Sequence, residues 1–166
     1  MKKPSPTKER LNAHRGMLEK LATLRQELEY AEDAYGSIRS PDFSGMPRGN
    51  SDPSKSPMVE AVIRKIELEE RIKRKEAEIA ADWAELEPFI EQLQPIETLI
   101  MNLRYYYGAE WDDVTFNVFG RRRDYAQKPD YYKSRTFKIH GRALVTLSGI
   151  IEGNSGGVPQ ELHRDE

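Results

Sequence analysis

The stretch DYYKSRTFKIHGRALVTL, residues 130–147, decides the fold of the C-terminal part of this chain. Small and apolar side chains recur in it at spacings of three and four, which is the period of one face of an α-helix. Asp130 is a residue type that caps helix N-termini. We therefore predict a helix from about Asp130 to Leu147. Its inward face is expected to carry Thr136, Ile139, Ala143, Leu144 and Leu147.

Two shorter helices are predicted immediately before this one. The first runs from Pro95 to Tyr107 and ends at Gly108, and the second runs from Trp111 to Phe119 and ends at Gly120. A short helix, a polar connection and a longer helix together have the order of a helix-turn-helix. Their inward residues are predicted to be Ile96, Leu99, Ile100 and Leu103 in the first helix, and Trp111, Val114 and Val118 in the second.

Basic side chains concentrate in this module, although the whole chain has a formal net charge of −2. Between Arg121 and Arg142, only Asp124 and Asp130 oppose them. A basic helix of this kind suits the major groove of double-stranded DNA, and phosphate contacts would make its affinity salt-sensitive. The alternative is a charged face that is merely solvated. The candidate DNA-binding cations are Arg121, Arg122, Arg123, Lys128, Lys133, Arg135, Lys138 and Arg142.

Three short motifs resemble the first half of a sigma-70 region 4 helix-turn-helix: LRYYYG at 103–108, WDDV at 111–114 and FG at 119–120. The run RTFKIHGRAL at 135–144 resembles the end of that family's recognition helix, which has an isoleucine four residues before an Ala-Leu pair. The chain order, with the loop GMPRGNSDP at 45–53, is also similar to a family of phage and prophage regulators of sigma-region-4-like or late-gene type.

This resemblance implies that the start of the recognition helix contacts bases and phosphates. Carried over by position, those residues are Tyr132, Lys133, Ser134, Arg135 and Lys138. One departure is an insertion from Arg121 to Tyr131, which acts either as a basic wing on phosphates or as a displacement of the recognition helix. If the likeness is deep, the module also contacts RNA polymerase, as region 4 does.

The N-terminal half is predicted to form two long amphipathic helices. The first begins at Ser5-Pro6 and ends near Gly36, the second begins at Ser56-Pro57, and Pro88 should kink or restart it. A loop rich in proline and glycine, residues 40–56, separates them. The expected structure is a coiled-coil-like hairpin whose stripes pack on each other or on a second copy of the chain. The stripes are Leu11, His14, Leu18, Leu21, Leu24, Leu28, Ala31 and Tyr35, then Val59, Val62, Ile63, Ile66, Ile72, Ile79, Trp83, Leu86, Ile90 and Leu93.

Several conspicuous side chains are better explained by packing than by chemistry. Trp83 and Trp111 fall in step with apolar neighbours, so both are expected in the core. The three tyrosines 105–107 should be a mixture of core and surface. His140 is expected to be a satisfied polar residue rather than a ligand, because the three histidines lack a metal-binding spacing.

Composition excludes several function classes. The chain has 166 residues, no cysteine and a mean hydropathy of −0.77, and it has no apolar run of membrane-spanning length. Adjacent pairs such as Asp112-Asp113 point about 100° apart on a helix, so they do not form a catalytic carboxylate dyad. We expect no enzyme, cofactor or metal site, and a cytoplasmic location in a bacterial host cell.

The expected architecture is all-α: a helical hairpin over 1–93, a helix-turn-helix over 94–150 and a flexible tail over 151–166. The expected function is a DNA-binding transcriptional regulator of phage or prophage genes. Two alternatives remain open at this point. One is a packaging or structural protein in which the coiled coil does the work, such as a small terminase subunit, and the other is a protein adaptor whose module no longer binds DNA.

Overall fold

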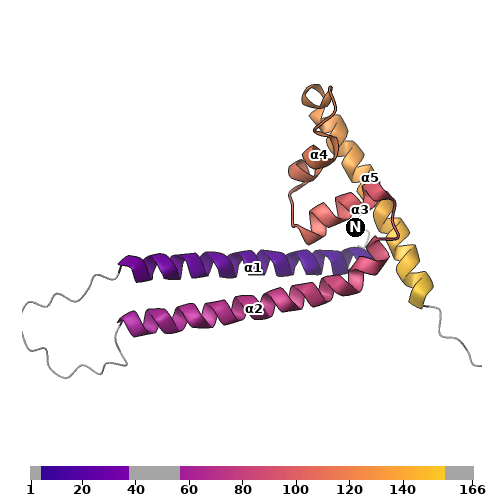
Figure 1. Ribbon diagram of the computed structural model, residues 1–166. Helices are drawn as coiled ribbons and strands as arrows, with labels where there is room; N and C mark the ends of the chain where they lie inside the picture. The colour runs from indigo at the N-terminus through magenta and orange to yellow at the C-terminus, as the bar shows by residue number, and fades with distance from the viewer. Residues whose placement is uncertain (1–4, 38–56, 156–166) are drawn as a thin grey trace, which may run out of the picture. The chain divides into compact units, whose positions relative to one another are not determined.

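The computed structural model describes residues 5–37 and 57–155, and the regular elements in these residues are helices (Figure 1). Since no strand occurs among them, the expected all-α class is confirmed. Over the same residues, no helix is both long and apolar enough to cross a membrane. The elements are α1 (Pro6–Ser37), α2 (Pro57–Ile90), α3 (Pro95–Met101), the π-helix η2 (Asn102–Tyr106), α4 (Trp111–Phe119), the 3₁₀ turn η3 (Tyr125–Gln127) and α5 (Pro129–Ser155).

The residue contacts divide the chain into two compact units. Unit 1 comprises residues 1–15 and 82–166, and unit 2 comprises residues 16–81. This division differs from the predicted boundary at residue 93, because Leu11 and Leu86 share a core cluster with Leu147. The predicted loop 40–56 lies outside the described residues. Of the predicted tail, only residues 151–155 are described, and they continue α5.

Unit 2 is an antiparallel pair formed by parts of α1 and α2, which lie side by side in Figure 1. Residues late in α1 pair with residues early in α2: Lys65 Nζ lies 2.8 Å from Glu32, whereas Arg25 lies 2.7 Å from Glu76. Exposed ion pairs of this kind add little stability, so buried aliphatic side chains hold the pair together. These are Leu21, Leu24, Leu68, Ile72 and Ile79.

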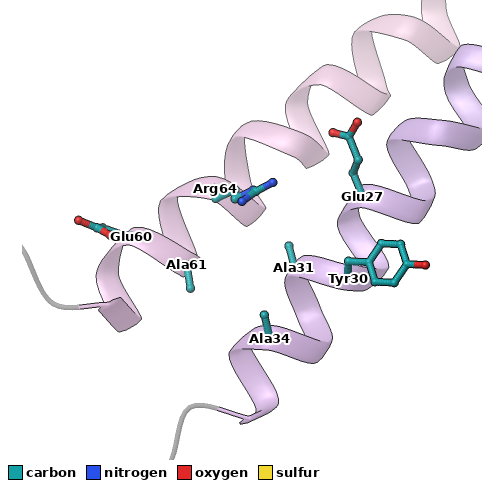
Figure 2. A pocket seen from close by; sticks show the side chains of 7 residues that line it. All are labelled: Glu27, Tyr30, Ala31, Ala34, Glu60, Ala61 and Arg64. Atoms are coloured by element: carbon teal, nitrogen blue, oxygen red, sulfur yellow. The ribbon is translucent and has the colours of Figure 1, made fainter.

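Toward the C-terminal end of α1 and the N-terminal end of α2, alanines take the place of leucines between the helices, and the seam opens. Ala31 and Ala34 of α1 point toward Ala61 of α2 (Figure 2). Together with charged and aromatic neighbours they line a pocket of about 410 Å³. Because a methyl group cannot fill the space that a leucine fills, packing between the helices is looser here than around Leu24 and Leu68.

Part of the predicted α2 stripe does not face α1. Val59, Val62, Ile63 and Ile66 are 38–50% exposed, so they do not pack on α1. Of the two arrangements predicted for this stripe, packing on a second copy of the chain stays a prediction for these residues. Leu68, which that stripe omitted, is buried instead. Spacing showed that these residues share a side of the helix, but it did not show which side faces the partner.

Unit 1 has two core clusters, and α3 contributes to both. Met101 packs in the first cluster with residues from α1, α2 and α5, while the preceding residue, Ile100, packs in the second. The first cluster comprises Leu11, Trp83, Leu86, Ile90, Leu93, Met101, Tyr105, Ala143 and Leu147. The second comprises Ile100, Val114, Phe119, Tyr132 and Ile139.

Most helix boundaries agree with the sequence. The bounds of α4 are the predicted ones, and Gly108 before it adopts φ 68°, a conformation that favours glycine. The predicted helix 95–107 appears as α3 followed by η2. Helix α2 continues through Pro88 to Ile90, so it does not restart there. The predicted end of the last helix near Leu147 is wrong, because α5 runs to Ser155.

Candidate nucleic-acid interface

The inward face of α5 fixes this helix against α4. Thr136 is fully buried, and its hydroxyl donates to the Tyr132 carbonyl oxygen at 3.0 Å while accepting from Thr115 Oγ1 at 3.2 Å. On either side of this contact, Tyr132 and Ile139 pack in one cluster with Val114 of α4. The rotation of α5 about its axis is therefore set by the core, and so is the face that it presents outward.

Three predicted site residues lie on that outward face. Ser134, Arg135 and Lys138 are all exposed. Ser134 and Lys138 are four residues apart, so they lie one turn apart on the same side of the helix. The Arg135 guanidinium lies 5.4 Å from the centroid of the Phe119 ring. A cation–π contact of this kind orients the side chain.

The segment between α4 and α5 presents the other cations. Arg121, Arg122, Arg123 and Lys128 are exposed, with Lys128 Nζ 3.7 Å from the Asp124 carboxylate. The chain enters this segment through Gly120, where an added Cβ would lie 2.5 Å from the Phe116 carbonyl oxygen. The tight turn thus depends on glycine, and the predicted insertion displays its basic residues to solvent.

Lys133 and Arg142 are partly committed to ion pairs within the fold. Lys133 Nζ lies 2.6 Å from Asp112 Oδ1, and this hydrogen bond raises the pKa of Lys133. Arg142 Nε lies 2.6 Å from Oε1 of Glu97, a buried carboxylate at the start of α3. Since a buried carboxylate without its partner is costly, Arg142 has a structural role that the sequence pattern did not indicate.

Tyr132 is a correction to the predicted site. Its side chain is only 5% exposed, and its ring packs in the second core cluster of unit 1. The hydroxyl donates a 2.6 Å hydrogen bond to Asp124, which raises the pKa of Tyr132 and lowers that of Asp124. Position within the resembling motif suggested a DNA contact, but helical phase places this residue on the same side as Ile139.

Acidic residues bound the basic surface. Asp112 and Asp113 are exposed in the first turn of α4, and Asp130 is exposed in that of α5. Carboxylates at a helix N-terminus interact favourably with its dipole, but they repel phosphates. Residues 111–142 contain eight lysines and arginines against four aspartates. The positive surface is therefore confined to the outward face of α5 and the segment before it.

Aromatic residues pack against the inward face of α5, and others lie exposed on the helix itself. The Trp111 ring lies 4.8 Å from His140, 4.9 Å from Phe137 and 4.6 Å from the Arg104 guanidinium carbon. Trp111 is packed against the second cluster, so the prediction of a core role is confirmed. Phe137 and Tyr131 are 42% and 56% exposed. Sequence reasoning missed these two surface aromatics, although the helical phase of Phe137, away from Ile139, was an available signal.

The predictions for Trp83, the three tyrosines and His140 are confirmed. Leu99, which was predicted to face inward, is instead 44% exposed, because the buried side of α3 carries Glu97, Ile100 and Met101. Trp83 is 5% exposed, and the three tyrosines divide into buried Tyr105 and exposed Tyr106 and Tyr107. His140 is buried, with Nε2 3.0 Å from the Tyr105 hydroxyl. Burial lowers the pKa of His140 to about 4, and the nearby charges of Lys8 and Arg104 contribute to this effect. At neutral pH the ring is uncharged and adds nothing to the positive surface.

Comparison with known proteins finds no family model, curated protein or solved structure that matches this chain. The described part of the chain also contains no group of three acidic, histidine or cysteine side chains placed to hold a metal ion.

Proposed function

We propose that unit 1 binds double-stranded DNA through a helix-turn-helix formed by α4 and α5, with α5 entering the major groove. The observation that carries this proposal is the division of α5 into two faces. One face is locked into the core through Thr136 and Ile139, and the other presents Ser134, Arg135 and Lys138 to solvent. A rigid cationic helix with a free outward face has the geometry that groove binding needs.

The exposed residues differ in the contacts that suit them. Arg135 and Lys138 have the donors that match guanine edges or phosphates, and Ser134 can reach either kind of group. Arg121, Arg122, Arg123 and Lys128 lie outside the helix, where phosphate contacts are the natural role. Lys133 and Arg142 contribute charge while held by Asp112 and Glu97. Tyr132 is left out of the proposed contact surface because it is buried.

A role in transcription rests on the resemblance of residues 103–120 and 135–144 to sigma-70 region 4. That likeness favours phage or prophage promoters as the target and RNA polymerase as the protein partner. In this proposal the antiparallel helices of unit 2 form a coiled-coil-like hairpin that serves protein contacts, and unit 1 supplies the DNA contact.

A labelled-duplex binding assay at two salt concentrations tests the proposal. The double variant Arg135→Ala with Lys138→Ala should bind about 30- to 1000-fold more weakly than the wild type, since each of the two base or phosphate contacts is worth about 1–2 kcal/mol. The matched control is Lys20→Ala with Arg71→Ala, which removes the same charge from exposed positions in unit 2. Circular dichroism confirms that both variants are folded.

Two results would contradict DNA binding through α5. One is the absence of any duplex binding at low salt, and the other is equal binding by the α5 variant and the control. Selection of bound duplexes from a random pool then tests sequence specificity. Recovery of a shared motif supports a regulator, whereas recovery of unrelated sequences contradicts specific recognition.

A further inference from the structure

Helix α2 carries an apolar face that the helix pair of unit 2 does not use. Met58, Val59, Val62, Ile63 and Ile66 are each 38–50% exposed. At about 100° per residue, these five residues share one side of the helix. That side is rotated by roughly 120° about the helix axis from Leu68 and Ile72, which pack in the seam with α1. Single exposed apolar residues are common, but five on one side form a patch of the kind that marks an interaction site.

The same side of α2 continues beyond Ile66 with a different chemistry. Two acids, Glu69 and Glu70, are followed one turn later by two bases, Lys73 and Arg74. After Arg74, the positions on this side of the helix are occupied by alanines. Glu70, Lys73, Arg74 and the alanines are exposed, and Glu69 is partly so. The face therefore runs in the order large apolar, acidic, basic, small, the last group being Ala77, Ala80 and Ala81.

We propose that this face, the outer face of α2, pairs with the same face of a second copy of the chain. The two helices run antiparallel, related by a two-fold axis that passes between Arg71 and Ile72. In this register Val62, Ile63 and Ile66 each meet an alanine, and each of the two acids meets a base. The pairs, first residue on one chain and second on the other, are Val62–Ala81, Ile63–Ala80, Ile66–Ala77, Glu69–Arg74 and Glu70–Lys73.

Self-complementarity identifies a second copy as the occupant. A branched side chain opposite an alanine lets two helix axes approach to about 8 Å, the close end of the usual range. Opposite charges face each other at the centre, which favours this orientation over others. Because the axis is two-fold, each of the five pairs occurs twice. From Val62 to Ala81 the contact is about 28 Å long at 1.5 Å per residue.

A parallel, in-register arrangement of the same two helices is unfavourable both for the charges and for the packing. It would set Glu70 against Glu70 and Lys73 against Lys73, and like charges in register are unfavourable. It would also set isoleucine against isoleucine at one end and alanine against alanine at the other, so that one end is crowded while the other is empty. The pattern thus specifies both the orientation and the register. The sequence prediction of an oligomer through the N-terminal helices left both open.

Disulfide cross-linking tests the register directly, because the wild-type chain has no cysteine. In the variant Val62→Cys with Ala81→Cys, the two positions on one helix are about 28 Å apart along the axis, so only a bond between two chains can form. We expect rapid formation of a covalent dimer on mild oxidation. The matched control, Val62→Cys with Ala77→Cys, shifts one cysteine by a turn and should cross-link much more slowly. Absence of the dimer, or equal rates in both variants, overturns the register.

Charge exchange tests the interface without cysteines. The wild type should show twice the 19.2 kDa chain mass in light scattering. Glu69→Arg with Glu70→Lys sets basic residues against basic residues and should weaken the dimer at least about tenfold, or about 1.4 kcal/mol. Adding Lys73→Glu and Arg74→Glu restores opposite charges and should restore the dimer.

A monomeric wild type overturns the proposal, as does a fourfold variant that stays monomeric while folded by circular dichroism. All of these measurements are made without DNA. Failure of the dimer therefore leaves the DNA-binding proposal to its own assay.

Discussion

At the scale of single residues, the polar side chains of α5 divide by helical phase rather than by chemical type. Tyr132, Thr136 and His140 follow one another at intervals of four, and all three are buried with a hydrogen-bond partner. Ser134 and Lys138 follow the same interval on the other side and are exposed. A polar residue of the first group stabilises the fold, and one of the second group is available to a ligand.

Substitution of Tyr132 should affect stability and not the DNA contact itself. Tyr132→Phe removes the 2.6 Å hydrogen bond to Asp124 and should lower the free energy of unfolding by about 1 kcal/mol. Tyr132→Ala also removes the packed ring and should cost about 3–5 kcal/mol. Urea unfolding measures both values. If folded Tyr132→Phe lost duplex binding as strongly as the α5 double variant does, our assignment of Tyr132 to the core would be wrong.

His140 should make stability depend on pH. Its folded pKa of about 4 lies below the unfolded value of 6.5, so the unfolded state takes up a proton first as the pH falls. The stability that the folded state gains from holding His140 uncharged is complete above pH 6.5 and is lost as the pH falls toward 4. Between neutral pH and that value, the wild type should lose about 2 kcal/mol more than His140→Gln, which has no ring to titrate. Parallel pH profiles for the two proteins would count against a buried neutral histidine.

At the scale of elements, two glycines should respond in opposite directions to a methyl group. Gly120→Ala places a Cβ 2.5 Å from the Phe116 carbonyl oxygen and should destabilise the turn after α4 by about 1–3 kcal/mol. Gly141→Ala meets no atom within 4 Å on the exposed side of α5 and should stabilise that helix by about 0.5–1 kcal/mol. Thermal unfolding of the two variants measures the contrast. Similar shifts for both would contradict the described turn.

The sequence predicted the elements best where local chemistry was sufficient. Gly108 and Gly120 bracket α4, so its bounds could be read directly. The inward residues Ile139 and Leu147 followed from helical period alone. The exposure of Ser134 and Lys138 then followed from their phase on the other side of the helix, whereas Arg135 lies four residues from Ile139 and its exposure could not be read from phase.

What the sequence did not predict depends on contacts between distant segments. Gly153, Asn154 and Ser155 favoured a tail after Ile150, but Ile150 and Ile151 pack against the first core cluster, and the helix continues to Ser155. The ion pair between Arg142 and Glu97 joins residues 45 positions apart, which no local pattern indicates. Periodicity likewise could not distinguish the face of α2 toward α1 from its outer face.

At the scale of the whole molecule, the distribution of charge matters more than its sum. The net charge of −2 would by itself disfavour a polyanionic partner. Salt confines electrostatic effects to about 10 Å at 0.1 M, so a phosphate responds mainly to the charges near it. Near Arg121 and Lys138 those charges are mostly basic, although Asp112 and Asp113 limit the extent of the surface. Binding by such a patch should be strong only at low salt.

The salt dependence of duplex binding should therefore report how many cations meet phosphates. Each such contact contributes about −0.9 to the slope of log K against log salt concentration. Replacing Arg121, Arg122 and Arg123 together by alanine should make the slope shallower by about 2–3 and weaken all duplexes alike. Lys20→Ala, Arg64→Ala and Arg71→Ala change the net charge equally from exposed positions in unit 2 and should leave the slope unchanged. Equal slopes for the arginine variant and the wild type would show that the segment before α5 does not contact DNA, and α5 would then have to bind without it.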